Sequence, residues 1–170
     1  MSFTCAFTGP RPHNLPFLLY DDHPAYLSLR QRLQKEITLL CEQGVTDFYC
    51  GMALGCDLLF AELVLELKKA YRINLHAVLP YRRHTADWDP ANQERCANLL
   101  KQCDNTTCLH ENYQPDCYIE RNHYMVDRAD ILLAVCDPDH LPQRSGTGAT
   151  VRYARRNDKR IYCIPPAAVL

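Results

Sequence analysis

The stretch FYCGMALGCD, residues 48–57, decides the fold because it passes from a β-rich run into a helical pattern across a short break. Gly51 and Gly55 stand at the two ends of that break. A helix that begins directly after a strand points its free N–H groups back toward the strand end, where they bind anions. The glycines are four residues apart and no Lys-Ser/Thr pair follows, so the pattern is neither GxGxxG nor a P-loop. The break therefore predicts either a phosphate-binding turn or a plain change of chain direction.

The same change from strand to helix recurs along the whole chain. Strands are expected at residues 2–8, 46–50, 73–79, 106–110, 131–137 and 160–164, and helices at 26–40, 57–71, 90–103, 117–129 and 148–157. Alternating strands and helices require right-handed crossovers and favour a parallel sheet covered on both faces. The sequence therefore predicts one domain over residues 1–170, a Rossmann-like, doubly wound α/β fold with a mostly parallel six-stranded sheet.

Composition and charge limit the classes of function. The net charge of −1, with Lys and Arg scattered, gives no basic stripe for nucleic acid, so a nucleic-acid partner is not expected. No run approaches the roughly 18 apolar residues of a membrane span, and residues 1–12 lack the features of a signal peptide, so a cytoplasmic protein without a membrane partner is expected. Cys5, Cys50, Cys136 and Cys163 lie in strand-like apolar runs, which favours reduced core thiols over disulfides.

Open α/β sheets bind ligands beyond the carboxyl ends of their strands, so the residues that follow each strand are the candidate site. The first strand ends at Thr8 and Gly9, and Arg11 offers a planar fork for phosphate or is a solvated arginine in a Pro-rich turn. The second strand leads through the glycine break to Asp57, which would stabilise the helix start or bind ribose hydroxyls.

Two further strand ends carry suitable chemistry. Pro80 and Tyr81 begin an aromatic and basic loop, residues 81–89, which is suited to stacking a base and is nearly as well explained as an exposed flexible loop. Asp137 ends the fifth strand, and the following loop leads to SGTGAT, residues 145–150, a second glycine turn before a helix. Two such turns in one sheet strengthen the prediction of a phosphate site.

The helix expected at 117–129 places Asn122 on a face with core residues, and Arg121 lies beside it. A buried amide requires hydrogen-bond partners. Asn122 is therefore either a structural bridge or a ligand contact.

Five blocks of the chain together resemble a known family. FTGPRP, GMALGCDLLFAELVLELK, LPYRRHTADW, RNHYMVDRADILLAVCDP and SGTGATVRYA are similar, in order and spacing, to the YpsA-like branch of the SLOG superfamily. That superfamily also includes the DNA-processing protein DprA, the LOG phosphoribohydrolases and ADP-ribose-sensing modules. The resemblance implies a Rossmann-like fold that holds an adenine nucleotide, NAD or an ADP-ribose-like ligand over the strand ends.

By position, the resemblance assigns the first ligand loop to the 51–57 break, the approach to the sugar phosphate to Arg121 and Asn122, and the second phosphate loop to residues 146–148. With the other strand ends, the candidate ligand residues are Thr8, Gly9, Arg11, Gly51, Met52, Gly55, Cys56, Asp57, Pro80, Tyr81, Arg121, Asn122, Asp137, Gly146, Thr147 and Gly148.

The sequence departs from the LOG enzymes at one informative place. Those enzymes carry a glutamate shortly after a Gly-Gly-x-Gly-Thr turn, whereas residues 149–152 here, Ala-Thr-Val-Arg, contain no carboxylate. Cleavage of an N-glycosidic bond then lacks its main chemical support. The leading hypothesis is a nucleotide-binding sensor, carrier or sequestering protein, and the rival is a hydrolase that uses Asp57, Asp137 or Glu62 instead.

Two weaker alternative functions and one expected partner, a second copy of the chain, remain. A zinc site would use Cys103, Cys108, His110 and Cys117, but their spacing matches no standard motif and favours incidental residues. A DNA-binding role like that of DprA lacks a basic stripe and a stacking platform. A homodimer is possible because related folds often dimerise, although no interface patch is visible in the sequence.

Overall fold

Six parallel strands form one sheet in the computed structural model, which describes residues 3–17 and 22–167. The strands are β1 (Phe3–Thr8), β2 (Val45–Cys50), β3 (Asn74–Leu79), β4 (Asn105–Cys108), β5 (Ile131–Val135) and β6 (Arg160–Ile164). Their order is β4-β3-β2-β1-β5-β6, with Cys5 of β1 opposite Phe48 of β2 and Ile131 of β5. The predicted doubly wound, parallel α/β fold is confirmed.

The strand order reverses beside β1. The chain moves outward from β1 through β2 and β3 to β4, and then returns to the other side of β1 for β5 and β6. The loops that follow β1 and β5 therefore leave neighbouring strands in opposite directions. Such a switch point is where open α/β sheets form a crevice.

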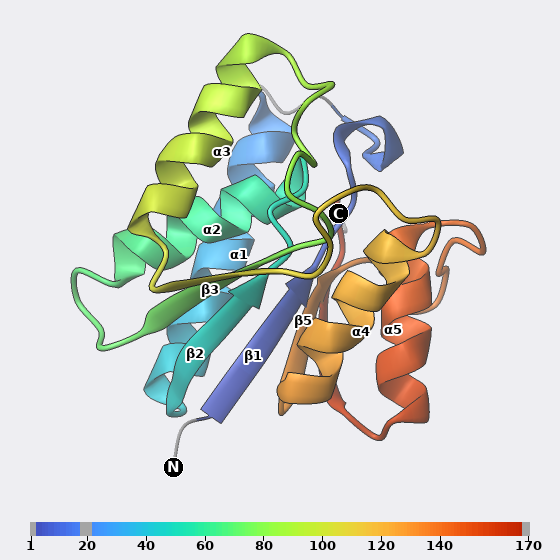
Figure 1. Cartoon of the computed structure of the whole chain (residues 1–170). Coiled ribbons are helices and arrows are strands. Elements are labelled where there is room, and N and C mark those ends of the chain that lie inside the picture. Colours follow the sequence, from blue (N-terminus) through green and yellow to red (C-terminus); the bar gives the residue numbers. More distant parts are fainter. Residues whose placement is uncertain (1–2, 18–21, 168–170) are drawn as a thin grey trace.

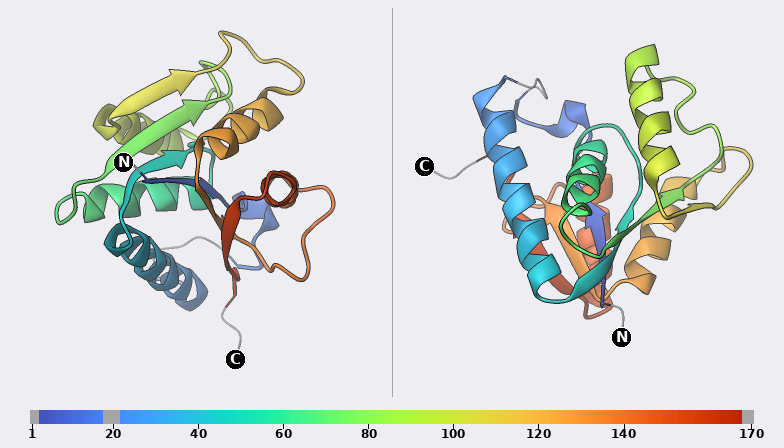
Figure 2. Two further views of the ribbon diagram at one scale, coloured as in Figure 1. Left: turned by 90° about the horizontal axis from the view of Figure 1, so that it is seen from below. Right: turned by 90° about the vertical axis from the view of Figure 1, so that its left-hand side faces the viewer.

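Helices cover both faces of the sheet, as Figures 1 and 2 show. One face carries α1 (Pro24–Glu42), α2 (Cys56–Leu67) and α3 (Pro90–Gln102), and the other carries α4 (Cys117–Arg128) and α5 (Gly146–Arg156). A short 3-10 turn, η1 (Pro12–Asn14), follows β1. No helix within the described residues combines the length and apolar character needed to cross a membrane.

Most element boundaries lie within two residues of the predicted ones, and two helix boundaries that differ have a structural explanation. Helix α5 begins at Gly146 rather than 148 because Ser145 Oγ accepts a hydrogen bond from the Gly148 N–H and caps the helix. Helix α2 ends at Leu67 rather than 71, since residues 68–70 form a turn. The first predicted strand residue, Ser2, lies outside the described residues.

The core has two halves, one on each face of the sheet. Residues of β1 alternate between them, so Phe7 packs toward α2 while Ala6 packs toward α4 and α5. The rings of Phe7 and Phe60 stack with centroids 4.3 Å apart, and Phe48 meets Phe60 edge-on at 6.0 Å. The ten cysteines are free thiols, and six of them are buried.

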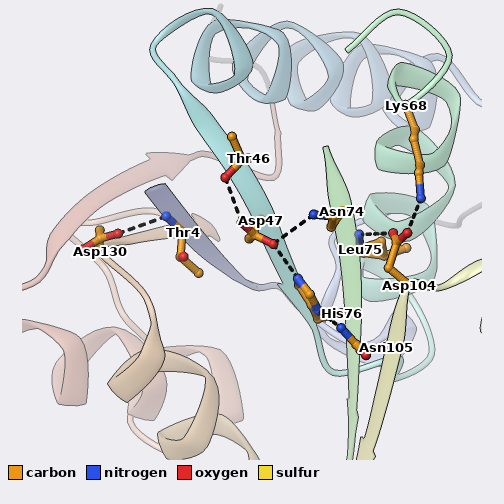
Figure 3. Close-up of polar contacts among 10 residues, drawn as sticks. All are labelled: Thr4, Thr46, Asp47, Lys68, Asn74, Leu75, His76, Asp104, Asn105 and Asp130. Atoms are coloured by element: carbon orange, nitrogen blue, oxygen red, sulfur yellow. Dashed lines mark hydrogen bonds and ion pairs between the residues drawn. The ribbon is translucent and has the colours of Figure 1, made fainter. Parts of the chain in front are cut away.

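Carboxylates fasten the amino ends of the strands, as Figure 3 shows. Asp130 Oδ2 accepts a hydrogen bond from the Thr4 N–H at 3.0 Å, and Asp104 Oδ2 accepts one from the Leu75 N–H at 2.9 Å. Asp47 Oδ1 lies 2.7 Å from His76 Nε2, which joins β2 to β3. These polar groups at the amino edge of the sheet are therefore hydrogen-bonded to one another, and the candidate site lies at the carboxyl edge.

The aromatic stack on α2 yields a test of the core. We expect Phe60→Ala to lower the free energy of unfolding by about 3–5 kcal/mol, because a fully buried ring is lost and leaves a cavity. Ile119→Ala, at a side chain with 51% exposure, is the control and should change it by less than about 0.5 kcal/mol. Urea denaturation measures both, and similar losses would contradict this description of the core.

Candidate functional site

A cavity of about 460 Å³ opens at the carboxyl edge of the sheet, between the loops that follow β1 and β5. Helix α4 and the first turn of α5 complete its wall. Its volume lies within the range of roughly 300–1,000 Å³ that is typical of small-molecule sites. The cavity thus lies at the switch point of the sheet, which is the expected position of a ligand in this fold.

The cavity brings together most of the predicted ligand residues from four segments of the chain. Its wall includes Thr8, Gly9, Arg11, Asp57, Arg121, Asn122, Asp137, Gly146 and Thr147. The other predicted residues lie outside its lining, namely Gly51, Met52, Gly55, Cys56, Pro80, Tyr81 and Gly148. The strand-end argument therefore located the cavity, and the tertiary structure decides which residues of each loop face it.

Arg121 is the central side chain of the wall. It is only 4% exposed, its Nε donates to Asn122 Oδ1 at 2.8 Å, and its Nη1 donates to the Gly51 carbonyl oxygen at 2.5 Å. Burial lowers the pKa of the Arg121 guanidinium, while the nearby Asp57 carboxyl favours its charged form. Asn122 is half-buried, so Arg121, and not the predicted Asn122, is the buried polar residue of α4.

Asp57 is the second buried ionisable group of the wall. Its Oδ2 accepts a hydrogen bond from the Ala53 N–H at 3.1 Å, which fixes the turn before α2. Burial raises the pKa of the Asp57 carboxyl, and the positive charge of Arg121 opposes that rise. Asp57 therefore supports its helix and also faces the cavity, so both roles considered from the sequence are open to it.

The glycine break at 51–55 is filled by other parts of the protein. A Cβ at Gly51 would lie 2.6 Å from Arg121 Nη1, and a Cβ at Gly55, where φ is +95°, would lie 2.7 Å from the Pro10 carbonyl oxygen. The Cys56 N–H donates to that same carbonyl oxygen at 3.2 Å. The break thus packs β1, α2 and α4 together, and direct ligand contact by these glycines stays a prediction.

The second glycine turn faces the cavity. The Gly148 N–H donates a hydrogen bond to Ser145 Oγ, while Gly146 and Thr147 belong to the cavity wall. The first N–H groups of a helix lack acceptors within the helix, so those of Gly146 and Thr147 are available to a ligand. A Cβ at Gly146 would meet only Asn122 Nδ2, at 3.9 Å, whereas a Cβ at Gly148 would clash with the Pro142 carbonyl oxygen, so the turn has room at Gly146 alone.

Sequence reasoning missed several polar residues of the wall. They are His13, Asn14, Tyr118, His140, Arg144 and Ser145. The Arg11 guanidinium lies 4.9 Å from the centroid of the Tyr118 ring, in a cation–π contact that joins the β1 loop to α4. Only Ser145 had a local signal, since a serine three residues before Gly148 matches an N-cap.

The three carboxylates proposed for catalysis occupy different places. Asp57 lines the cavity from a buried position, and Asp137 lines it from an exposed one. Asp137 Oδ1 accepts a hydrogen bond from the Asp139 N–H, and this bond lowers the pKa of the Asp137 carboxyl below its usual value. Glu62 lies outside the lining and pairs with Arg95 of α3. Of the three, Asp57 and Asp137 remain available to a ligand in the cavity.

A second cavity, of about 250 Å³, adjoins the first and shares Arg11, Tyr118 and Arg121 with it. The loop after β3 contributes His84 and Trp88 to this cavity. Nε2 of His84 lies 3.0 Å from the Met52 carbonyl oxygen. Burial lowers the pKa of the His84 imidazole to about 4, and the positive charges of the two arginines act in the same direction.

The proposed zinc ligands were also located. Cys108 Sγ donates to the His110 carbonyl oxygen, Cys117 is buried, and His110 pairs with Glu120. Within residues 3–17 and 22–167, no group of three or more His, Cys, Asp or Glu residues is arranged to hold a metal ion.

The fold and cavity define a Rossmann-like α/β protein with a ligand-sized site at the switch point of its sheet. Residues 5–169 match the YpsA family model, described as "YspA SLOG family", so the chain belongs to this family and the resemblance seen in the sequence is confirmed. A UPF0398 protein of Bacillus pumilus (strain SAFR-032) is 30% identical over 138 residues, which cover 79% of this chain and 74% of that protein.

UPF0398 proteins of Staphylococcus aureus strains JH9 and JH1 are 28% identical over 122 residues. The match covers 70% of this chain and 65% of those proteins, so it spans slightly less than two thirds of their length. These names specify neither a ligand nor a reaction.

The contact between Gly51 and Arg121 yields a direct test. Gly51→Ala should lower the free energy of unfolding by about 1–3 kcal/mol, because the added methyl group displaces the buried guanidinium. Gly146→Ala is the matched control and should have little effect, since its Cβ would make only an ordinary van der Waals contact with Asn122 Nδ2, at 3.9 Å. Denaturation curves of the two variants provide the comparison, and equal stabilities would contradict the described packing.

His84 makes stability depend on pH. Its pKa is about 4 in the folded protein against 6.5 for an unperturbed imidazole, so the unfolded chain binds more protons between these values. The contribution of His84 to the free energy of unfolding is therefore fully present above pH 6.5 and is lost as the pH falls toward 4. The loss amounts to about 3 kcal/mol, since each pKa unit corresponds to about 1.36 kcal/mol. Denaturation of the protein and of His84→Gln from pH 7.5 to 4 measures the difference, and parallel curves would contradict it.

Proposed function

We propose that this protein binds a nucleotide-type ligand, such as an adenine nucleotide, NAD or ADP-ribose, in the cavity at the carboxyl edge of its sheet. The observation that carries the proposal is the composition of the wall: the open first turn of α5 lies in the same cavity as Arg11, Arg121 and Arg144. Membership of the SLOG family supports a nucleotide-related role. The bound molecule would act as a signal, a cargo or a sequestered metabolite.

The phosphate end of the ligand is assigned to the α5 side of the cavity. The N–H groups of Gly146 and Thr147 and the positive end of the helix dipole favour an anion there. Asn122 Nδ2 lies on the same side, and its Oδ1 is already used by Arg121. The wall contains three arginines and only two carboxylates, those of Asp57 and Asp137. This excess of positive charge also favours a phosphate.

The sugar is assigned to the neighbourhood of Asp57. One carboxylate oxygen of Asp57 is used by the Ala53 N–H, and the other is available to accept hydrogen bonds from ribose hydroxyl groups. The thermodynamic cost of burying this carboxyl would be offset in part by those contacts and by Arg121.

Hydrolysis of an N-glycosidic bond is the second candidate function. Its specific support is the buried Asp57, because a carboxyl group with a raised pKa beside a cavity is the type of group that performs acid–base chemistry. Binding without reaction is favoured because no carboxylate follows the second glycine turn in residues 149–152. Released base in the presence of the protein, abolished by Asp57→Asn, would establish the enzyme instead.

We further infer that residues 1–170 act as one cytoplasmic domain, alone or as a homodimer. The free thiols and near-neutral net charge support this setting and argue against nucleic acid as a partner.

Arg11 provides the test of the proposed function. It is exposed and lies over Tyr118, so Arg11→Ala should leave the fold intact and weaken ADP-ribose binding about 10- to 100-fold through loss of charge-assisted hydrogen bonds. Arg83→Ala removes the same charge from an exposed position outside both linings and is the matched control. Isothermal titration with ADP-ribose, NAD and AMP measures the affinities.

Two results would contradict the proposal. Absence of binding to all three compounds at millimolar concentration would remove the nucleotide site. Equal losses in Arg11→Ala and Arg83→Ala would mean that binding responds to overall charge and does not use this cavity.

A further inference from the structure

His84 contains an unsatisfied polar atom beside the second cavity. Among the described residues, its Nδ1 is a buried side-chain nitrogen without a hydrogen-bond partner, and the residue as a whole is only 7% exposed. Buried polar atoms are nearly always paired, so such an exception calls for an explanation. His84 also belongs to the wall of the second cavity, which makes a ligand group a candidate partner.

The neighbours of the ring decide what kind of group Nδ1 requires. Nε2 lies 3.0 Å from the Met52 carbonyl oxygen, which only accepts hydrogen bonds, so Nε2 must carry the hydrogen. A neutral imidazole with its hydrogen on Nε2 has a lone pair on Nδ1. Nδ1 is therefore an acceptor, and its missing partner is a donor such as an amine or a hydroxyl group.

The rest of this cavity is suited to a flat aromatic ring. Trp88 meets the His84 ring edge-on, with centroids 5.4 Å apart, and Tyr118 and Leu54 supply further apolar surface. Aromatic side chains bind flat heterocycles by stacking and edge contacts. The cationic groups Arg11 and Arg121 stand where this cavity adjoins the first one.

The two cavities differ in hydrogen-bonding character. The first offers N–H donors and arginines, whereas His84, in the wall of the second, carries an acceptor nitrogen that is closed to solvent and has no partner among the described residues. Phosphate oxygens carry lone pairs of their own, so they match the first cavity and are repelled by His84 Nδ1. A ligand with a phosphate at one end and an amine-bearing ring at the other would satisfy both.

We propose that the second cavity is the base subsite of the ligand site, and that it takes an amino-substituted nitrogen heterocycle whose amine donates to His84 Nδ1 beside Trp88. This inference rests on the proposed nucleotide function and adds the position and chemistry of the base. Nδ1 is closed to solvent in this structure, so the contact requires the His84 ring to rotate toward the cavity. The phosphate of the same molecule extends past Arg11 and Arg121 toward α5.

Trp88 makes the subsite directly observable, because it is the sole tryptophan of the chain. We expect AMP to change the fluorescence of Trp88, and ribose 5-phosphate, which lacks a base, to bind with little change. Purine riboside 5′-monophosphate lacks only the exocyclic amine of AMP, so it should change the fluorescence but bind about tenfold more weakly. Titration calorimetry of all three compounds gives the affinities independently of fluorescence.

Two variants separate the contact from the fold. His84→Phe keeps a flat ring and removes the acceptor at Nδ1 together with the hydrogen bond to the Met52 carbonyl oxygen, so AMP and purine riboside 5′-monophosphate should then bind equally. Trp88→Phe should weaken AMP severalfold while ribose 5-phosphate binds as before. Thermal melts at pH 7.5 verify that each variant is folded, and the Trp88→Phe result stands if His84→Phe does not fold.

The outcomes distinguish this inference from the proposed function. Binding of AMP by calorimetry without a fluorescence change, or with the same affinity as ribose 5-phosphate, would overturn the base subsite and leave the phosphate site standing. Equal affinities of unmodified protein for AMP and purine riboside 5′-monophosphate would overturn the role of His84. If none of the three compounds binds, the base subsite is wrong, and the titrations with ADP-ribose and NAD decide whether the nucleotide function stands.

Discussion

The buried guanidinium of Arg121 is the constraint on which the site depends. A charge removed from water is costly unless its hydrogen bonds and its electrostatic partners are supplied by the protein. Here the Gly51 carbonyl oxygen and Asn122 Oδ1 accept from it, and the Asp57 carboxyl stabilises its charge. These contacts join α4 to the turn between β2 and α2, which come from opposite faces of the sheet (Figure 1).

That requirement explains features that otherwise look unrelated. Gly51 has no room for a side chain because the guanidinium fills the space, and Asp57 is tolerated in a buried position because positive charge lies nearby. Arg121 also forms part of the wall shared by the two cavities. A ligand in either cavity would therefore act on one electrostatic system, in which a phosphate and Asp57 share the same cations.

The two edges of the sheet differ in how their polar groups are used. At the amino edge, Asp130 and Asp104 accept hydrogen bonds from the first N–H groups of β1 and β3, and Asp47 engages His76. At the carboxyl edge, the N–H groups of Gly146 and Thr147 in α5 and Nδ1 of His84 lack such partners within the described residues. A parallel sheet creates this asymmetry because helices begin near the carboxyl ends of strands, so the unpaired donors collect at one edge.

The sequence by itself determined the order of strands and helices along the chain and the edge of the sheet at which the cavity lies. Alternating apolar residues, helical periodicity and caps such as Asp89 are local signals, and parallel strand ends such as Thr8 and Asp137 must meet at one edge. Helical periodicity placed Asn122 among core residues with Arg121 beside it, whereas in the structure Arg121 is the buried one. The predicted start of α5 was two residues late because the capping hydrogen bond to Ser145 Oγ moves the start of the helix to Gly146.

Only the tertiary structure decided how the glycine turns are used and what completes the cavities. The 51–55 turn is filled by Arg121 and Pro10, which lie far away in the sequence, whereas the 146–148 turn remains partly open. The unpaired Nδ1 of His84 is likewise a tertiary feature, because Met52 engages Nε2 and no donor among the described residues reaches Nδ1. The physical reason is that burial, close approach and missing hydrogen-bond partners arise between distant segments, and no local pattern encodes them.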